Sequence, residues 1–269
     1  MTAHAWGDPS ALKALSWGVL AFSLVASATY IFNDLADVAF DQAHTNKRLR
    51  PIAAGDVSRA AALMVGLVLL VVGVGIAWLQ NLTLALVTLL YVALTTAYTR
   101  HAKRVALLDV LLLAALWTLR LLAGASAIAV DLSVWLLSFS AFLFLSLSLL
   151  KRCAELIAFD GPMDAFLPGR GYQRRDLLSL QSFGIGTAVV SVLVLALFVD
   201  SQAAALRYPH AERLWLICPA MWFWLARLWM QTARGEMHHD PVVFSLRDRA
   251  SWLVGVVVVL GWCAALVPF

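Results

Sequence analysis

The sequence ALKALSWGVLAFSLVASATYIFNDLADVAFD, residues 11–41, joins an apolar stretch long enough to cross a bilayer to a row of acidic side chains. If this stretch is helical, Asp34, Asp37 and Asp41 follow one another at i, i+3 and i+7 and project toward one face. Asn33 lies one turn before Asp37 on the same face. Carboxylates are costly at membrane depth, and three on one stripe repel one another unless a cation lies between them. Mg2+ takes oxygen ligands and commonly bridges carboxylates to substrate phosphates, so the stripe predicts a magnesium site formed by its three Asp residues.

Composition identifies the chain as an integral membrane protein. Of its 269 residues, 62% are hydrophobic and 13% are charged, whereas soluble domains carry roughly 25% charged residues. We therefore expect an all-α, polytopic membrane helix bundle of about eight transmembrane helices, folded as a single domain over residues 1–269. Each apolar segment is close to the ~20 residues that a helix needs to cross the hydrocarbon core, and the segments are 11–36, 58–80, 82–99, 105–130, 133–157, 179–200, 211–231 and 250–268.

Basic residues gather on alternate connections between these segments. The second and fourth connections hold no Lys or Arg and the sixth holds two Arg, whereas each odd-numbered connection, with the helix end leading into it, holds at least three Lys or Arg residues. An excess of Lys and Arg marks cytoplasmic loops, so we expect the acidic stripe at the end of the first segment to face the cytoplasm. The net charge of +4 is therefore a sign of topology and anion binding, and we expect no nucleic-acid partner.

The loop that follows the acidic stripe has the charges that a diphosphate needs. It reads QAHTNKRLRPIAAGDVS, residues 42–58, and places Lys47 and Arg50 within a short loop's reach of the carboxylates. A metal ion on some phosphate oxygens, with Lys or Arg on others, would neutralise a diphosphate. The alternative is a positive-inside anchor, which explains the cations but leaves the three spaced Asp residues and the Asn unexplained.

The third connection supplies further candidate phosphate contacts. In YTRHAKRVALLD, residues 98–109, we expect Tyr98, Lys103 and Arg104 to bind substrate, with Asp109 as a supporting acid. Topology alone also demands cations in a short cytoplasmic loop, and this simpler explanation stays open.

The fifth apolar segment ends in a second charged group. Lys151, Arg152 and Glu155 lie at the expected membrane edge, and Arg170 follows in the glycine-rich loop PGRGYQRRD, residues 168–176. Flexible glycine backbone beside arginines can cradle phosphate, so we expect all four side chains to contribute to substrate binding. The alternative is a salt-bridged helix end, because Lys151 and Glu155 are spaced at i and i+4.

One further cation lies in the middle of an apolar segment. Arg120 occurs in ALWTLRLLAGA, residues 115–125. A guanidinium within a membrane span needs a partner, and Asp109 lies three turns away on a similar face. Whether Arg120 is structural or reaches an active-site cavity stays open from the sequence.

These motifs together resemble a known family. NDLADVAFD at 33–41, followed by KRLRPIAAG at 47–55, resembles the first signature of the UbiA superfamily of intramembrane prenyltransferases. The resemblance covers nearly the whole chain. Later blocks are similar to the branch that contains decaprenyl-phosphate phosphoribosyltransferases, and to domains fused to haloacid-dehalogenase-like domains: YTRHAKRVALLDVL, TLRLLAGA, LLKRCAEL, GRGY and DPVVFSLRDR.

Two departures from the superfamily pattern are visible. The resemblance implies nine transmembrane helices, with an RPxQWxKN-like block on the first; that block is absent here, so we expect a chain one helix short. This expectation agrees with the topology: eight spans with the first connection inside place both termini outside, yet residues 1–10 contain no signal-peptide pattern. Either the first segment inserts in reverse, or an upstream helix is missing, and we expect the second. The second departure is that KRCAEL, residues 151–156, stands where quinone- and haem-type prenyltransferases carry a second DxxxD motif.

The resemblance implies a Mg2+-dependent transferase in the bacterial cytoplasmic (inner) membrane, with its active site facing the cytoplasm. Asp34, Asp37 and Asp41 would hold Mg2+ on the diphosphate of phosphoribosyl diphosphate, Asn33 would orient that shell, and polyprenyl phosphate would be the acceptor. The alternative places a polyprenyl diphosphate on the same stripe, with an aromatic or other acceptor being alkylated. A non-enzymatic transporter is a third possibility, although such proteins tend to show internal repeats and none is clear here.

Overall fold

The computed structural model describes residues 8–43, 47–237 and 240–267 of the chain. Within these ranges the regular elements are helices, and the only β-type pairing is an isolated bridge between Phe166 and Gln173. The predicted all-α fold is confirmed, and each predicted apolar segment corresponds to one long helix. These helices are α2 (Pro9–Ala43), α4 (Arg59–Gln80), α5 (Leu82–Arg100), α6 (Leu108–Ala127), α7 (Val134–Ile157), α8 (Leu177–Val199), α10 (Ile217–Ala233) and α12 (Arg249–Leu266).

The lengths and apolar character of these helices suit a membrane. Within the described part of the chain, seven helices are long and apolar enough to cross a bilayer. The remaining long helix, α10, has 17 residues and is preceded by the 3-10 helix η4 (Ala211–Leu216). Large apolar side chains such as Val71 (70% exposed) and Leu79 (86% exposed) cover the outer faces, as contact with hydrocarbon requires. The chain is therefore an integral membrane protein.

The chain packs as two compact units. The first unit comprises residues 1–105 and 116–132, and the second comprises residues 106–115 and 133–269. The boundary falls within α6, so the beginning of this helix belongs to the second unit and the rest to the first. The single domain that the sequence suggests stays a prediction.

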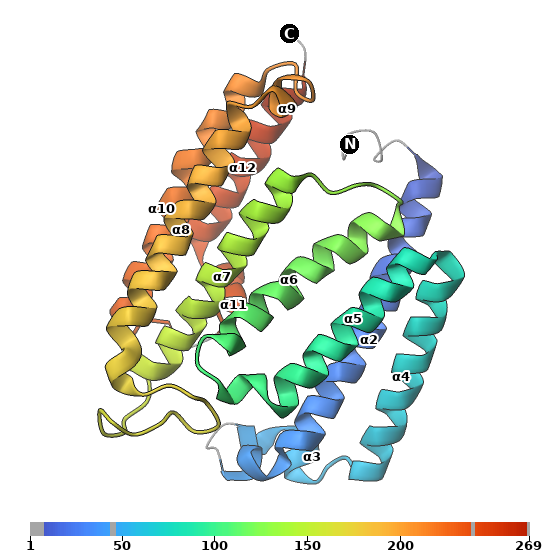
Figure 1. Cartoon of the computed structure of the whole chain (residues 1–269), viewed down its shortest axis with the longest axis vertical. Helices are drawn as coiled ribbons and strands as arrows, with labels where there is room; N and C mark the ends of the chain where they lie inside the picture. The colour runs from blue at the N-terminus through green and yellow to red at the C-terminus, as the bar shows by residue number, and fades with distance from the viewer. Residues whose placement is uncertain (1–7, 44–46, 238–239, 268–269) are drawn as a thin grey trace. The chain divides into compact units, whose positions relative to one another are not determined.

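In the first unit, α2 packs along α4, and both helices contact α5 (Figure 1). Their shared core includes Phe22 and Tyr91, whose ring centroids lie 4.7 Å apart. Asn81 ends α4 and caps α5 by accepting a 2.8 Å hydrogen bond from the Leu84 backbone N–H. The Asn81 side chain also donates to the carbonyl of Ser126, at 3.0 Å, and so holds the α4–α5 hairpin against the end of α6.

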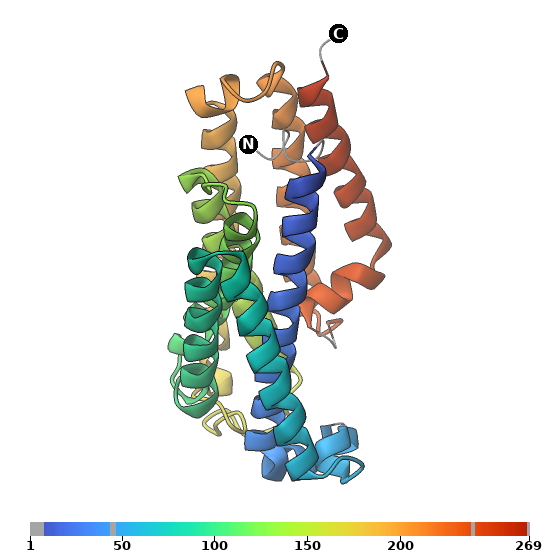
Figure 2. The same ribbon diagram turned by 90° about the vertical axis from the view of Figure 1, so that its right-hand side faces the viewer.

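The short elements η1 (Lys47–Leu49) and α3 (Pro51–Ala54) lie beside the end of α2, near the point where α4 begins (Figure 2). The Gln42 side chain donates to the carbonyl of Ala53 at 3.1 Å. This bond ties α3 back to the last turn of α2, where the acidic stripe lies.

In the second unit, α7 packs along α8, and α10 contacts α7, α8 and α12. One serine connects three of these helices. The Trp229 indole N–H donates to Ser146 Oγ at 3.1 Å, and Ser146 Oγ donates to the carbonyl of Gly184 at 2.8 Å. The first turn of α12 is stabilised by Asp248, which caps the helix by accepting a 2.9 Å hydrogen bond from the Ser251 backbone N–H.

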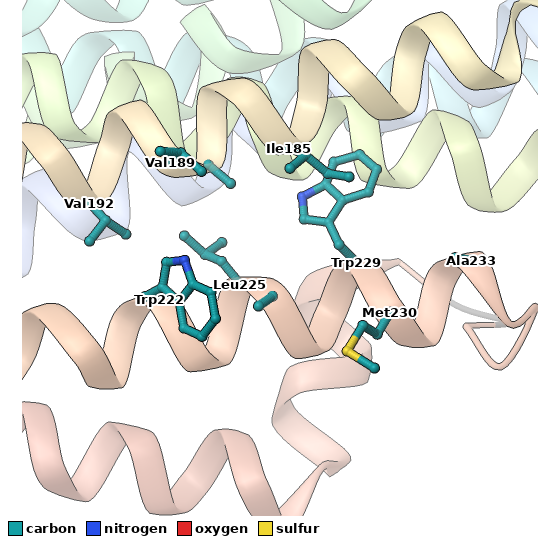
Figure 3. A pocket seen from close by; sticks show the side chains of 10 residues that line it. Ile185, Val189, Val192, Trp222, Leu225, Trp229, Met230 and Ala233 are labelled. Carbon is teal, nitrogen blue, oxygen red and sulfur yellow. The ribbon is translucent and has the colours of Figure 1, made fainter.

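An apolar groove of about 360 Å³ runs between α8 and α10 (Figure 3). Its walls are formed by Ile185, Val189 and Val192 on one helix and by Trp222 and Met230 on the other. A lining of this kind offers no charged or hydrogen-bonding side chain except the indole N–H groups. Any site for charged substrates therefore lies elsewhere in the molecule.

The contact between α8 and Trp229 makes a prediction about stability. A Cβ at Gly184 would overlap the Trp229 ring and lie 3.1 Å from Leu149 Cβ, whereas a Cβ at Gly186 meets no atom within 4 Å. Because Ser146 fixes the indole, we expect Gly184→Ala to lower the free energy of unfolding by about 1–3 kcal/mol through overpacking. Unfolding of the purified protein in detergent micelles, followed by tryptophan fluorescence, measures this change.

The matched control is Gly186→Ala, which makes the same chemical change on the same helix in open space. We expect this variant to be as stable as the wild type or slightly more stable, because Ala favours helix more than Gly does. Equal stability of the two variants would contradict the packing described here.

Candidate active site

The acidic stripe occupies the last turns of α2 and is neutralised from the following loop. Arg50 Nη1 lies 2.8 Å from Asp34 Oδ1 and 2.8 Å from Asp41 Oδ2. Asp41 is buried, while Asp34 is partly exposed. The two carboxylates therefore converge on one cationic nitrogen.

Local sequence explains why Arg50 reaches this position. Arg50 is the N-cap residue of α3 and has an extended backbone, with φ −64° and ψ 139°, directly before Pro51. A proline restricts the residue before it to extended conformations and suits the first position of a helix. Gly55 ends α3 with a φ of +88°, in the left-handed region that glycine adopts without strain. The RPIAAG segment thus forms a compact turn against the end of α2.

The other two stripe residues are held by Thr99 at the end of α5 and by Lys103 on the short 3-10 helix that follows α5. Lys103 Nζ lies 2.5 Å from Asp37 Oδ1, and the Lys103 side chain is only 9% exposed. Thr99 Oγ1 donates to Asn33 Oδ1 at 3.1 Å. Each of the four predicted stripe residues therefore contacts a residue of a neighbouring segment, and within the described part of the chain both Arg50 and Lys103 contact carboxylates of the stripe.

The remaining predicted residues of the first unit are placed as follows. Tyr98 is partly buried at the end of α5, next to Thr99. Arg104 ends the 3-10 helix η2 (Ala102–Arg104) and is exposed. The side chain of Lys47 lies outside the part of the chain that the structure describes.

The carboxylate oxygens of the stripe are of the ligand type that binds a divalent cation, and in this structure they form ion pairs with Arg50 and Lys103. Across residues 8–43, 47–237 and 240–267, no three His, Cys, Asp or Glu side chains gather as a metal site. Asp34 and Asp41 nevertheless direct an oxygen each toward one nitrogen of Arg50. Carboxylate oxygens that already share one cationic atom are the ligand type that Mg2+ prefers.

A second charged group lies within the second unit. Arg152 and Asp109 are both fully buried, with Arg152 Nη2 2.7 Å from Asp109 Oδ2. Arg152 Nη1 also bonds Glu155, and the Tyr172 hydroxyl donates to Asp109 Oδ1. Leu107 completes the network, because its backbone N–H donates to the Tyr172 hydroxyl at 2.8 Å. Burial, together with the bond to Asp109, raises the pKa of Tyr172 well above its ordinary value, so the phenol stays protonated.

The alternative pairing of Lys151 with Glu155 is wrong. The sequence spacing suggested Lys151 with Glu155, but Lys151 Nζ lies 2.6 Å from Asp240 Oδ2 and Glu155 bonds Arg152. Arg170 contributes as well, with its Nε 4.0 Å from the Glu155 carboxylate. The i, i+4 rule fails here because the nearest acid to Lys151 comes from the N-cap of α11 (Pro241–Arg247), far along the chain.

The partner suggested for Arg120 is also wrong. Asp109 bonds Arg152 and Tyr172, and Arg120 contacts aromatic side chains within the first unit instead. Asp109 pairs with Arg152 of α7 because it lies at the beginning of α6, beside α7. Arg120 lies about three turns further along α6.

Sequence reasoning missed Thr99 and Tyr172 as supporting residues. Tyr172 could have been found, since it belongs to the GRGY block quoted above, but its partner Asp109 precedes it by 63 positions. Thr99 gives no signal of its own, because threonines are common in apolar helices.

Residues 1–155, which contain the acidic stripe and the buried Arg152, match the UbiA prenyltransferase family. The chain belongs to this family. It is a family of transferases, and the resemblance seen in the sequence motifs is confirmed.

Similar proteins come from several bacteria. The chain is 38% identical to protein y4nM of Sinorhizobium fredii over 260 residues, which is 96% of this chain and 50% of that protein. Nodulation protein NoeC of Azorhizobium caulinodans is 33% identical over 259 residues, which is 95% of this chain and 82% of that protein. Decaprenyl-phosphate phosphoribosyltransferase of Mycobacterium tuberculosis is 39% identical over 145 residues, which is 54% of this chain and 48% of that protein. The chain thus spans about half the length of the first and third of these relatives.

Solved structures share the fold. A UbiA homolog from Archaeoglobus fulgidus bound to GPP and Mg2+ superposes with a TM-score of 0.68 at 17% identity, over 93% of this chain and 85% of that one. The same homolog bound to DMAPP and Mg2+ gives a TM-score of 0.67. The predicted UbiA-like helix bundle is therefore confirmed.

The buried network of the second unit makes a prediction about stability. Removing the charge of Asp109 leaves the fully buried Arg152 with less compensation, and breaking a buried ion pair costs about 3–5 kcal/mol. We expect Asp109→Asn to lower the free energy of unfolding by this order. Tyr172→Phe removes one hydrogen bond to a charged group and should cost about 1–3 kcal/mol.

Chemical denaturation in detergent micelles measures both effects. Asp131→Asn makes the same change at an exposed position of a loop and should leave stability within about 0.5 kcal/mol of the wild type. If Asp109→Asn proved as mild as this control, Asp109 would not be the counter-ion that holds Arg152.

Proposed function

We propose that this protein transfers a phosphoribosyl group from phosphoribosyl diphosphate to polyprenyl phosphate, in a Mg2+-dependent reaction at the cytoplasmic face of a bacterial inner membrane. The observation that supports this most strongly is the shared contact of Asp34 and Asp41 with one nitrogen of Arg50, beside the Asp37–Lys103 pair. Carboxylates and cations in alternation are the groups that a metal-bound diphosphate needs.

In this proposal Asp34, Asp37 and Asp41 hold Mg2+, which when bound neutralises the charge that develops on the leaving diphosphate. Arg50 and Lys103 then bind phosphate oxygens in place of the carboxylates that they now contact. These two cations lie beside the stripe, so exchanging a carboxylate for a phosphate requires only short side-chain movements.

Asn33 orients the diphosphate. Thr99 donates to its carbonyl oxygen at 3.1 Å and so fixes the plane of the carboxamide. The amide N–H groups then point away from Thr99 and can donate to an anionic oxygen, which is the role that we assign to them.

The acceptor needs no general base, because the phosphate of a polyprenyl phosphate is already anionic. A phosphate oxygen of the lipid forms a bond to the anomeric carbon of the ribose as the bond from that carbon to the diphosphate oxygen breaks. Diphosphate leaves with its electron pair, and nothing is oxidised or reduced. The other residues proposed to bind phosphates are Lys47, Tyr98 and Arg104 in the first unit and Lys151 and Arg170 in the second. Glu155 contacts both Arg152 and Arg170, whereas Lys151 is held by Asp240.

The relatives support this donor and acceptor, since one of them is named as a decaprenyl-phosphate phosphoribosyltransferase and is 39% identical over 145 residues. The alternative follows from the family itself, whose name describes prenyl transfer. In that alternative a polyprenyl diphosphate occupies the same stripe and alkylates an aromatic or other acceptor. Membership of a transferase family disfavours the transporter.

Purified protein in nanodiscs, given radiolabelled phosphoribosyl diphosphate and polyprenyl phosphate, tests the proposal. We expect lipid-linked ribose in the presence of Mg2+ and none after chelation with EDTA, with recovery when Mg2+ is restored. Asp37→Ala should reduce turnover by at least about 100-fold, because loss of one transition-state charge contact typically costs this much.

The matched control is Asp56→Ala, which removes an exposed carboxylate from the same loop region and should leave turnover unchanged. A wild-type protein that makes no lipid-linked ribose, but consumes a polyprenyl diphosphate in the presence of an aromatic acceptor, would decide for the alternative.

A further inference from the structure

Arg120 lies near the middle of α6 in an aromatic environment within the first unit. Its guanidinium carbon lies 4.2 Å from the centroid of the Trp117 ring. One of its terminal nitrogens, Nη2, lies 3.4 Å from the hydroxyl of Tyr30 on α2 and 3.4 Å from that of Tyr91 on α5. Both hydrogen bonds are longer than the 2.9–3.0 Å typical of N–H···O bonds, so both are weak.

The contacts of Arg120 leave its charge uncompensated. Among the described residues, no carboxylate forms an ion pair with Arg120, and its contacts are two phenol hydroxyls and an indole face. A guanidinium at membrane depth is costly unless a partner balances its charge. The buried cations Lys103 and Arg152 each have such a carboxylate.

Arg120 lies close to the acidic stripe but deeper in the membrane. Tyr30 precedes Asn33 and Asp34 by three and four residues on α2, so the three side chains share one face. Four residues of α-helix rise about 6 Å. Asp37 and Asp41 follow Tyr30 by about two and three turns, so the guanidinium that contacts Tyr30 lies between about one and three helical turns further from the cytoplasmic end of α2 than the carboxylates do.

We propose that Arg120 binds a phosphoryl anion at this depth, and that the anion is the phosphate of the lipid acceptor. This inference deepens the proposed function and rests on it for the identity of the reaction. The planar guanidinium matches a phosphate, and the two tyrosine hydroxyls beside it supply further donors. Tyr30 is 61% exposed, so the group is open on one side.

The surroundings favour a lipid phosphate over a water-soluble diphosphate. Arg120 lies in the middle of the apolar helix α6 among aromatic rings from three helices. Arg50 and Lys103 instead lie beside the proposed metal ligands at the end of α2. A molecule with a single phosphate and an apolar chain can place its charge on Arg120 while its chain stays in hydrocarbon. Its phosphate then lies further into the membrane than the diphosphate held beside the three carboxylates.

Binding experiments without turnover test this assignment. Protein in nanodiscs is titrated with a long-chain polyprenyl phosphate, with the matched polyprenol that lacks the phosphate, and with inorganic diphosphate plus Mg2+, and tryptophan fluorescence reports binding. We expect Arg120→Gln to weaken binding of the polyprenyl phosphate about 10- to 100-fold, as loss of charge-assisted hydrogen bonds does. Binding of the polyprenol should change by less than about twofold.

Arg120→Lys separates anion binding from a structural role. Lysine keeps the charge but cannot stack on Trp117 and contact two tyrosines as arginine does, so it should restore much of the phosphate affinity even if it lowers thermal stability. Arg234→Gln, at an exposed position of the chain, should change no affinity.

The outcomes are distinct. A loss confined to the lipid phosphate supports the proposal in full, and a loss confined to inorganic diphosphate supports a phosphoryl site whose ligand is the donor. Unchanged binding of both, or equal losses for polyprenyl phosphate and polyprenol, would overturn it. If the wild type makes no lipid-linked ribose, the proposed function fails, while these binding measurements still decide the role of Arg120.

Discussion

The first unit depends on one electrostatic constraint, which is that three carboxylates share the last turns of a membrane helix. Arg50 and Lys103 meet this constraint from two different segments, and both contacts are short. To deliver Arg50, the chain must turn back directly after α2, and Pro51 with Gly55 forms that turn. The KRLRPIAAG segment is therefore as much a part of the acidic site as the Asp residues are.

The second unit meets a similar constraint in a different environment. Asp109 and Arg152 are completely buried, and the phenol of Tyr172 satisfies a second carboxylate oxygen. A buried ion pair adds little net stability but is costly to break, so this pair favours one arrangement of the beginning of α6, of α7 and of the loop before α8. Arg152 is thereby held rigidly, while Lys151 and Glu155 on the same helix stay partly exposed.

Hydropathy and helical spacing predict much of this molecule. The eight apolar segments correspond to eight helices, and the i, i+3, i+7 spacing places Asp34, Asp37 and Asp41 where two cations can reach them, because both properties depend only on local sequence. The partners of Lys151, Arg120 and Asp109 were not predictable in this way. Each pairing depends on which helix packs against which, and a carboxylate far along the chain, such as Asp240, can lie nearer than one on the next turn.

The cations of the first unit also differ in ways that follow their depth. Arg50 is more than one-third exposed and contacts two carboxylates, Lys103 is nearly buried and contacts one, and Arg120 is surrounded by aromatic rings. A water-soluble substrate would require cations beside the end of α2 alone, since a charge placed deeper adds a desolvation cost without a contact. The deeper cation becomes reasonable when one substrate carries its phosphate on an apolar chain, because that phosphate lies at the boundary of water and hydrocarbon. The positions of Arg50 and Lys103 beside the end of α2, and of Arg120 in the middle of α6, support the proposed reaction between one soluble and one lipid phosphate.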